Sequence, residues 1–196
     1  MIVVSAPSGS GKTTLCRNIV SSRPNTRYSI SATTRPARKG EKNGRDYLFL
    51  SRDDFEKKKQ KGEFIEWANV FGEYYGTIRQ LVENTRNEGK DIVLNIDIQG
   101  ASQVKKRCPE AVLIFILPPS IGILEQRLRN RKSDTEDEIL KRLQLAKTEI
   151  SKVDNYDYVV VNEDIKGSVD KLLAIITAEK SKLERMRDEI DASCRA

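Results

Sequence analysis

The sequence predicts an α/β fold in which helices flank a central parallel sheet, and two observations support this prediction. Apolar runs recur at 1–5, 91–96, 111–117 and 157–161, and helical periodicity fills the intervals between them. The runs are continuous rather than alternating, which is typical of parallel strands buried on both faces. A length of 196 residues with 38% hydrophobic content fits one globular domain.

The first predicted strand leads into a phosphate-binding loop. The strand Ile2-Val3-Val4 is followed, before an amphipathic stretch, by Ala6-Pro7-Ser8-Gly9-Ser10-Gly11-Lys12-Thr13-Thr14. A buried strand fixes such a loop, glycines let backbone N–H groups converge on one anion, and the next helix points its positive end at the phosphates. Ala6 replaces the first glycine of the strict GxxxxGK[ST] pattern, so the match depends on Gly9, Gly11, Lys12 and Thr13. The alternative is a flexible Ser/Gly connection.

Residues 31–78 interrupt the alternation of strands and helices. They are polar and rich in Arg, Tyr and Gly, with short alternating segments at 47–50 and 64–70. A short helix lies between these segments, and we expect Ser51 to cap it and Gly62 to end it. We therefore predict an inserted lobe of mixed α/β structure.

A second excursion, at 129–135, separates two helices near the carboxyl end. Thr135 and Glu138 have capping-box spacing, so the second of these helices should begin there. In the last 30 residues, apolar side chains at three-to-four spacing predict one long amphipathic helix. We expect this helix to leave the core after about residue 184, which leaves open a contact with a second copy of the chain.

Composition excludes several classes of function. The chain contains no histidine, which removes the most common general base and every His-based metal site. The net charge of +6 suits anionic ligands, but basic and acidic residues are interleaved without a recognition motif, so nucleic acid is not expected as a partner. Phosphoryl transfer suits such a chain, because it depends on positioning and charge neutralisation more than on proton abstraction.

The same composition predicts a cytoplasmic protein. The sequence has neither a long apolar run nor a basic-then-apolar leader, so we expect no membrane association and no processing. Its cysteines, Cys16, Cys108 and Cys194, are odd in number and far apart, which fits neither a disulfide framework nor a zinc site.

The densest group of candidate binding residues lies in the predicted lobe. Arg35, Arg38 and Tyr47 together could clamp a phosphate, because Arg forks bind phosphate oxygens bidentately; the alternative is a solvated basic loop. Glu66 lies within an apolar strand, where an unpaired charge is costly, so it needs a donor. That donor is either a protein arginine or a ligand with two adjacent N–H groups, as in guanine. Spacing alone does not separate Tyr74 from Tyr75 as a binding residue.

With these residues in place, the sequence closely resembles the guanylate kinases over essentially its full length. The resemblance is carried by SAPSGSGKTT, SATTRPARKGEKNGRDY, GEFIEWANVFGEYYGT, LNIDIQGA, FILPPS, RLRNR, KRL and VVVNED. It implies a P-loop kinase fold with a GMP-binding lobe at 31–78, a small helical lid at 126–149, and a core formed by 1–30, 79–125 and 150–196. It also implies that, with Mg²⁺, the γ-phosphoryl of ATP is transferred to GMP in purine nucleotide metabolism, giving ADP and GDP; use of dGMP is left open.

The resemblance also assigns residues to the two nucleotides. The ATP phosphates would be bound by residues 6–14, including Lys12 on the β- and γ-phosphates, and by the lid arginines Arg127, Arg131 and Arg142. Asn162 would lie near the adenine. The GMP phosphate would be bound by Arg35, Arg38, Tyr47 and Tyr75, and the guanine by Ser31, Glu66 and Thr77. Catalytic roles are expected for Lys12, Arg38, Arg131 and Arg142. From the residues alone, Arg127 and Arg142 would be ordinary helix-surface ion-pair partners.

The magnesium side of the site contains one departure from the family. Thr13 would be a ligand of Mg²⁺, and Asp97, at the end of an apolar run, would act on Mg²⁺ through water or hold the acceptor nucleotide. Asn95 stands where guanylate kinases usually carry an acid, so the role of position 95 toward Mg²⁺ or the acceptor is open, although we expect activity to be kept because Asp97 is intact.

Two other functions compete with this interpretation. Scaffold proteins contain guanylate-kinase-like domains that bind peptides, but these usually lie in longer chains and have a degraded P-loop, whereas Gly11, Lys12 and Thr13 are intact here. A related P-loop kinase with a ribose bisphosphate acceptor would share the loop and lid. It should lack the base-reading set Ser31, Glu66 and Thr77.

Overall fold

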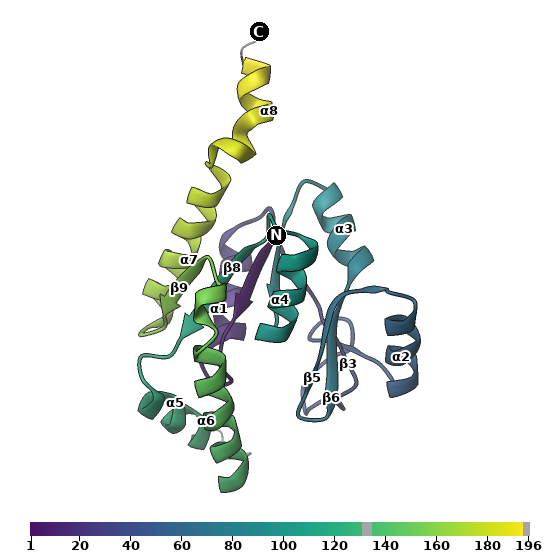
Figure 1. Ribbon diagram of the computed structural model, residues 1–196, viewed down its shortest axis with the longest axis vertical. Helices are drawn as coiled ribbons and strands as arrows, with labels where there is room; N and C mark the ends of the chain where they lie inside the picture. The colour runs from purple at the N-terminus through teal and green to yellow at the C-terminus, as the bar shows by residue number, and fades with distance from the viewer. Residues whose placement is uncertain (131–134, 194–196) are drawn as a thin grey trace.

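A five-stranded parallel sheet forms the centre of the protein in the computed structural model, which describes residues 1–130 and 135–193 (Figure 1). Its order is β2 (Thr26–Tyr28), β7 (Asp91–Asn95), β1 (Ile2–Ser5), β8 (Val112–Leu117) and β9 (Tyr158–Val161), and all neighbouring pairs are parallel. The prediction of a buried parallel sheet is confirmed. β2 was not predicted, because a three-residue Thr-Arg-Tyr strand at the sheet edge lacks an apolar run.

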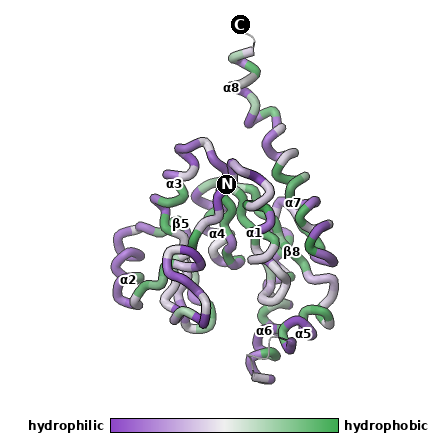
Figure 2. Tube along the Cα trace, turned by 180° about the vertical axis from the view of Figure 1, so that it is seen from behind, coloured by the Kyte–Doolittle hydropathy of each residue, from purple (hydrophilic) through white to green (hydrophobic). Residues whose placement is uncertain are grey.

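Helices cover both faces of this sheet. On one face, α1 (Lys12–Ser22) and α7 (Ile165–Lys180) pack on a core that includes Val4. On the other face, α3 (Arg79–Asn87) and α4 (Ile98–Arg107) pack on a core that includes Val3. Alternate strand residues thus serve opposite faces, and both are apolar because both are covered. The hydrophobic segments accordingly run through the interior in Figure 2.

The inserted lobe, residues 31–78, has its own four-stranded sheet. The order is β4 (Leu48–Phe49), β3 (Ala32–Thr33), β6 (Glu73–Ile78) and β5 (Phe64–Val70), and α2 (Arg52–Gln60) packs Phe55 against it. The caps expected for α2 are confirmed. The Ser51 side chain accepts a hydrogen bond from the Asp54 backbone N–H at 3.0 Å, and Gly62 follows the helix with a φ of +67°.

The lid region at 126–149 is formed by two helices. These are α5 (Ile121–Arg129) and α6 (Glu136–Ile150), which share a small apolar core. Thr135 and Glu138 form the predicted capping box at the start of α6. After α6, a single 3-10 turn (Val153–Asn155) returns the chain to β9.

The prediction of one long C-terminal helix is wrong. α7 ends at Lys180, and a separate helix, α8 (Leu183–Ser193), projects beyond the body of the protein (Figure 1). The buried Glu179 accepts a hydrogen bond from the Tyr158 hydroxyl and pairs with Lys182 and Arg185. These contacts, one from β9 and two from residues just past α7, favour the break. Leu183 and Ile190 are exposed, so α8 does leave the core as expected. No helix in the described residues is long and apolar enough to cross a membrane.

Candidate active site

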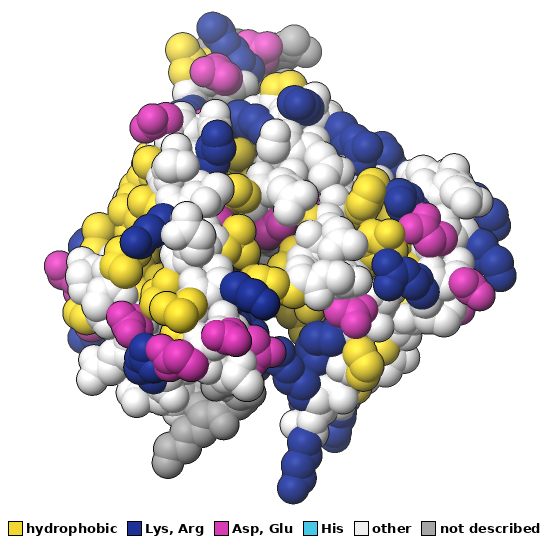
Figure 3. Space-filling view, turned by 60° about the horizontal axis from the view of Figure 1, so that its bottom comes forward, with side chains coloured by type: hydrophobic (Ala, Val, Ile, Leu, Met, Phe, Trp, Pro, Cys, Tyr) yellow, Lys and Arg dark blue, Asp and Glu magenta, His cyan; other side chains and the backbone are white. Residues whose placement is uncertain are grey.

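A cleft of about 580 Å³ lies between the phosphate-binding loop, the lobe, the carboxyl end of β7, and α6. Figure 3 shows the molecule hollowed between the lid side and the lobe side. Most of the residues predicted for the site line this cleft: Ala6, Pro7, Ser8, Gly9, Gly11, Lys12, Thr13, Thr14, Ser31, Arg35, Arg38, Tyr47, Glu66, Tyr75, Asp97 and Arg142. Ser10, Thr77, Arg127 and Asn162 are not in its wall, and Arg131 lies outside the described residues.

The phosphate-binding loop has the predicted strand–loop–helix geometry. Gly9 and Gly11 have φ angles of +97° and +87°, which side-chain-bearing residues rarely adopt. A Cβ on Gly11 would also lie 2.6 Å from the Asn162 amide nitrogen. Gly11 is the N-cap of α1, and neither a capping side chain nor an acidic residue occupies the first turn. The N–H groups of that turn are therefore available to an anion.

Lys12 lies at the base of this loop. Its ammonium donates to the Ile96 carbonyl oxygen at 2.9 Å, which ties the start of α1 to the end of β7. Burial lowers the pKa of Lys12, and the carboxylates of Glu149, Asp97 and Glu66 oppose that shift. Because burial disfavours the isolated charge, a phosphate group entering the cleft would be a strongly favourable partner for the ammonium.

Thr13 and Asn95 form the side of the cleft where a metal ion would lie. The Asn95 amide nitrogen donates to the Thr13 hydroxyl at 3.1 Å and to the Tyr28 hydroxyl at 2.7 Å. The described residues contain no group of three or more carboxylate or thiolate side chains that could hold a metal ion by themselves. This donor set fits Mg²⁺ held by few protein ligands together with nucleotide phosphates, because Mg²⁺ is usually bound in that way.

Asp97 caps α4 and also faces the cleft. One of its carboxylate oxygens accepts from the Gly100 backbone N–H at 2.8 Å, and the other accepts from Gln99 at 3.3 Å. The cap fixes the carboxylate at the carboxyl end of the sheet, where ligands bind in α/β folds.

Glu66 is a buried carboxylate that forms no ion pair with a cation of the described residues. Its exposed fraction is 2%, and the Thr77 hydroxyl donates to one carboxylate oxygen at 2.6 Å. Burial raises the pKa of Glu66 to about 7, against the hydrogen bond from Thr77, and the charge of Asp97 raises it further. In the described part of the chain, the hydrogen bonds to this carboxylate come from Thr77, and the arginine partner considered above forms no ion pair with it.

Gly100 makes room for this carboxylate. A Cβ on Gly100 would lie 2.3 Å from the second oxygen of Glu66. Sequence reasoning did not select Gly100, although a glycine in the first turn of a helix is a detectable signal because it weakens the helix unless packing requires it. Thr77, predicted to bind the guanine, contacts Glu66 in this structure. Its buried hydroxyl donates a hydrogen bond to Glu66 and so orients the carboxylate.

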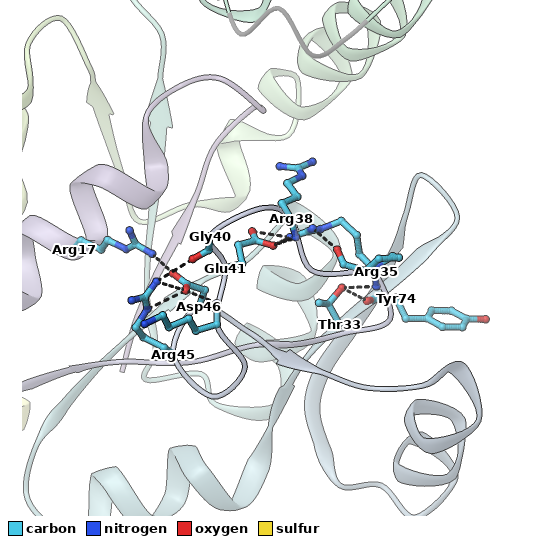
Figure 4. A network of polar contacts seen from close by, with 11 residues as sticks. Arg17, Thr33, Arg35, Arg38, Gly40, Glu41, Arg45, Asp46 and Tyr74 are labelled. Carbon is cyan, nitrogen blue, oxygen red and sulfur yellow. Dashed lines mark hydrogen bonds and ion pairs between the residues drawn. The ribbon is translucent and has the colours of Figure 1, made fainter.

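The expected phosphate clamp is organised by a residue that sequence reasoning missed. Glu41 accepts from the Arg35 guanidinium at 2.9 and 3.0 Å and from the Arg38 backbone N–H at 2.7 Å. The Arg38 guanidinium extends away from Glu41 in Figure 4, free of that carboxylate. The Arg35 guanidinium lies 5.4 Å from the centre of the Tyr47 ring. The sequence signal was the three-residue spacing of Arg35, Arg38 and Glu41 around a turn.

The structure separates the two tyrosines that spacing could not. Tyr75 lines the cleft, and its ring packs edge-on to that of Tyr47 at 6.1 Å. Tyr74 points to the other side of β6 and stacks on Phe55 at 5.3 Å, inside the core of the lobe. The strand alternation therefore assigns Tyr75 to the cleft and Tyr74 to packing.

The arginines of the lid have different environments. Arg142 on α6 donates to the Ser8 hydroxyl at 2.9 Å, which joins the lid to the phosphate-binding loop. Arg127 on α5 donates instead to the Asn162 carbonyl oxygen at 3.4 Å and does not line the cleft.

Asn162, predicted to lie near the adenine, has its side chain hydrogen-bonded within the protein. Its side-chain nitrogen donates to the Ser10 carbonyl oxygen at 2.7 Å, and its side-chain oxygen accepts from Ser168 at 3.0 Å. Both ends of the buried amide are thus used within the protein. Asn162 supports the phosphate-binding loop from behind.

Glu149 is a further acidic residue of the cleft that sequence reasoning missed. It is 8% exposed, on the apolar face of α6, and its carboxylate makes no hydrogen bond to residues 1–130 or 135–193. Burial raises its pKa to about 7, opposed by the charge of Lys12. The signal was an acid three residues after Ala146 on an apolar helix face, the same kind of signal that identified Glu66.

Comparison with known proteins identifies the family to which the chain belongs. A family model described as guanylate kinase matches residues 1–179. The chain belongs to the guanylate kinase family. The guanylate kinase of Carboxydothermus hydrogenoformans is 52% identical over 186 residues, which cover 95% of this chain and 91% of that relative. The guanylate kinase of Thermotoga maritima is 42% identical over 191 residues, covering 97% of this chain and 92% of the relative.

A solved structure of the family agrees with the fold. The crystal structure of guanylate kinase from Anaplasma phagocytophilum superposes with a TM-score of 0.80 at 39% identity, covering 94% of this chain and 88% of that chain. The resemblance inferred from the motifs is therefore confirmed at the level of the family and the fold.

Proposed function

We propose that this member of the guanylate kinase family transfers the γ-phosphoryl group of ATP to GMP, with Mg²⁺ accompanying ATP. The observation that carries this proposal is Glu66, a buried carboxylate that opens into the same cleft as the phosphate-binding loop. Guanine offers adjacent N1–H and 2-amino donors to such a carboxylate, whereas adenine offers no such pair. Family membership and the intact loop support the same conclusion.

The residues of the cleft divide between the two nucleotides. We assign the ATP phosphates to the first turn of α1, to Lys12 and to Arg142, and we assign the GMP phosphate to Arg35, Arg38, Tyr47 and Tyr75. Ser31 and Glu66 would read the guanine, while Thr77 and Gly100 hold the Glu66 carboxylate in place. Mg²⁺, when bound with ATP, would neutralise phosphate charge beside Thr13.

Phosphoryl transfer in this site needs no general base. The attacking group is a phosphate oxygen of GMP, which is largely ionised near neutral pH because the second pKa of a phosphate monoester is about 6. The protein's task is to bring two anionic phosphates together and to neutralise the charge spread over the transferred group. Lys12, Arg38 and Arg142 supply positive charge from three sides of the cleft.

An acceptor panel tests the proposal. ADP release from Mg²⁺-ATP would be measured with GMP, AMP, CMP, UMP and a ribose bisphosphate. We expect turnover with GMP and not with the other acceptors. Turnover with the ribose bisphosphate would identify a related kinase of different specificity. Tight GMP binding without turnover would instead identify a non-catalytic module.

A further inference from the structure

Phe71 is an unusual residue at the tip of the β5–β6 hairpin in the lobe. It is 59% exposed, which makes it the most exposed large hydrophobic side chain of the lobe. Its φ of +54° is the only positive φ outside glycine in the described residues. An aromatic residue is costly in that conformation, and strain of this kind is typically found at functional positions.

The turn itself does not require an aromatic residue. Gly72 follows with a φ of +86°, and its N–H donates to the Asn69 side chain at 3.0 Å. Two consecutive positive φ angles favour Asn-Gly in a hairpin turn, because Asn tolerates this conformation far better than Phe. The local sequence therefore departs from what the backbone favours, which points to a purpose for the ring.

The ring of Phe71 lies on Arg142 of the lid. The guanidinium carbon is 5.5 Å from the ring centre, within cation–π range, and Phe71 and Arg142 both line the cleft. Because Arg142 also donates to Ser8, its guanidinium joins three separate parts of the chain: the lobe, the lid and the phosphate-binding loop. This contact between the lobe and the lid does not pass through the core sheet.

We propose that Phe71 is a positioning residue that holds the Arg142 guanidinium beside the phosphate-binding loop, so that the lobe that binds GMP and the lid that binds ATP are energetically coupled. The inference rests on the proposed function, since it takes GMP to occupy the lobe and ATP the loop. The lobe, as placed in this structure, sets the ring on the arginine, and an arginine held in this way is ordered for the ATP phosphates. The coupling is reciprocal, so each nucleotide should tighten the other.

Calorimetry on the full chain tests the coupling directly. The affinity of a non-hydrolysable ATP analogue would be measured with and without saturating GMP, in the parent protein and in Phe71→Asn. Asn suits the positive φ, so this variant removes the ring and keeps the turn. We expect GMP to tighten the analogue in the parent and this enhancement to fall about 2- to 30-fold in the variant, the range of a cation–π contact. The affinity for GMP alone should stay the same.

Three further variants separate positioning from a merely structural role. Phe71→Tyr keeps the ring and should restore the coupling. Phe71→Gly relieves the backbone without a ring and should lose the coupling while unfolding at no lower temperature. Leu81→Asn removes another exposed apolar side chain, on α3, and should leave the coupling unchanged. Coupling retained in both Phe71→Asn and Phe71→Gly would overturn the proposal.

A double-mutant cycle with Arg142→Ala identifies the partner. We expect Phe71→Asn to lower kcat with little change in the KM for GMP, and to have no further effect once Arg142 is removed. Additive effects would show that Phe71 acts elsewhere. A parent protein that couples the two ligands but does not turn over GMP would count against the proposed function and leave the Phe71 contact supported.

Discussion

Replacing Glu66 by Gln should make this protein more stable and much less active, and the pH decides when the stability gain appears. The substitution keeps the shape of the side chain and removes its charge. Glu66 is 2% exposed and hydrogen-bonded to Thr77, and burial raises its pKa from an ordinary value of 4.5 to about 7. The folded protein therefore binds this proton more tightly than the unfolded chain does.

The sign and size of the stability effect follow from that difference. A raised carboxyl pKa contributes stability that is present at low pH and is lost as pH rises from about 4.5 through about 7. At about 1.36 kcal/mol per pKa unit, the ionised carboxylate costs about 3 kcal/mol at pH 8 and less than about 1 kcal/mol at pH 5. Gln does not titrate, so Glu66→Gln should gain about 3 kcal/mol at pH 8 and little at pH 5.

Although the variant should gain stability, its activity with GMP should fall. In the variant, an amide nitrogen in place of a carboxylate oxygen faces the N–H donors of guanine. The bound complex therefore loses one or two charged hydrogen bonds of about 1.5–3 kcal/mol each. The kcat/KM for GMP should drop about 10²- to 10⁴-fold, while the affinity for an ATP analogue stays the same. Urea unfolding at pH 5 and pH 8 and steady-state kinetics measure the two effects. Equal stability changes at both pH values would refute the buried-charge argument, and an unchanged kcat/KM would refute the role in reading guanine.

The remaining predictions concern other parts of the cleft. Lys12→Met should lower turnover by about 10²- to 10³-fold with an unchanged circular dichroism melting curve; full activity would contradict its role at the phosphates. Asn95→Asp should bind Mn²⁺ several-fold more tightly in the ADP complex, measured by electron paramagnetic resonance titration, because a carboxylate then replaces the amide beside Thr13. Glu149→Gln should gain stability in urea at pH 8 relative to pH 5, since its pKa is also raised to about 7; a pH-independent change would contradict this. Asn162→Ala leaves the Ser10 carbonyl oxygen unpaired, so we expect a loss of about 1–3 kcal/mol in stability and weaker ATP-analogue binding, with GMP affinity unchanged in calorimetry.

Sequence patterns were sufficient where the structure is determined locally. The strand–loop–helix around Gly9 and Gly11, the cap at Ser51 and the capping box at Thr135 depend on neighbours within a few residues, and each was predicted correctly. An acid in an apolar strand also identified Glu66, because the cost of burying a charge is visible in the sequence.

Features that depend on distant partners were not predictable in this way. The break between α7 and α8 involves Glu179, whose partner Tyr158 comes from a strand 21 residues earlier. The role of Asn162 depends on Ser10, 152 residues away in the chain. A single sequence does not show which of its distant residues are in contact. The resemblance to a family placed Asn162 near the nucleotide, and the structure shows its contact with Ser10.

Buried acids in the cleft lower the stability of the unliganded protein, and the same acids contribute to its selectivity. Burial lowers the pKa of Lys12 and raises those of Glu66 and Glu149, so the charged form of each group is less favourable here than in water. Phosphate oxygens would restore a partner to Lys12, and the N–H donors of guanine would restore one to Glu66. AMP carries the same phosphate but leaves Glu66 buried without its donors. Discrimination between the two purines then comes from the free-energy cost of the buried Glu66 carboxylate, which guanine offsets and adenine does not. A site in which an arginine paired with Glu66 would be more stable and less selective.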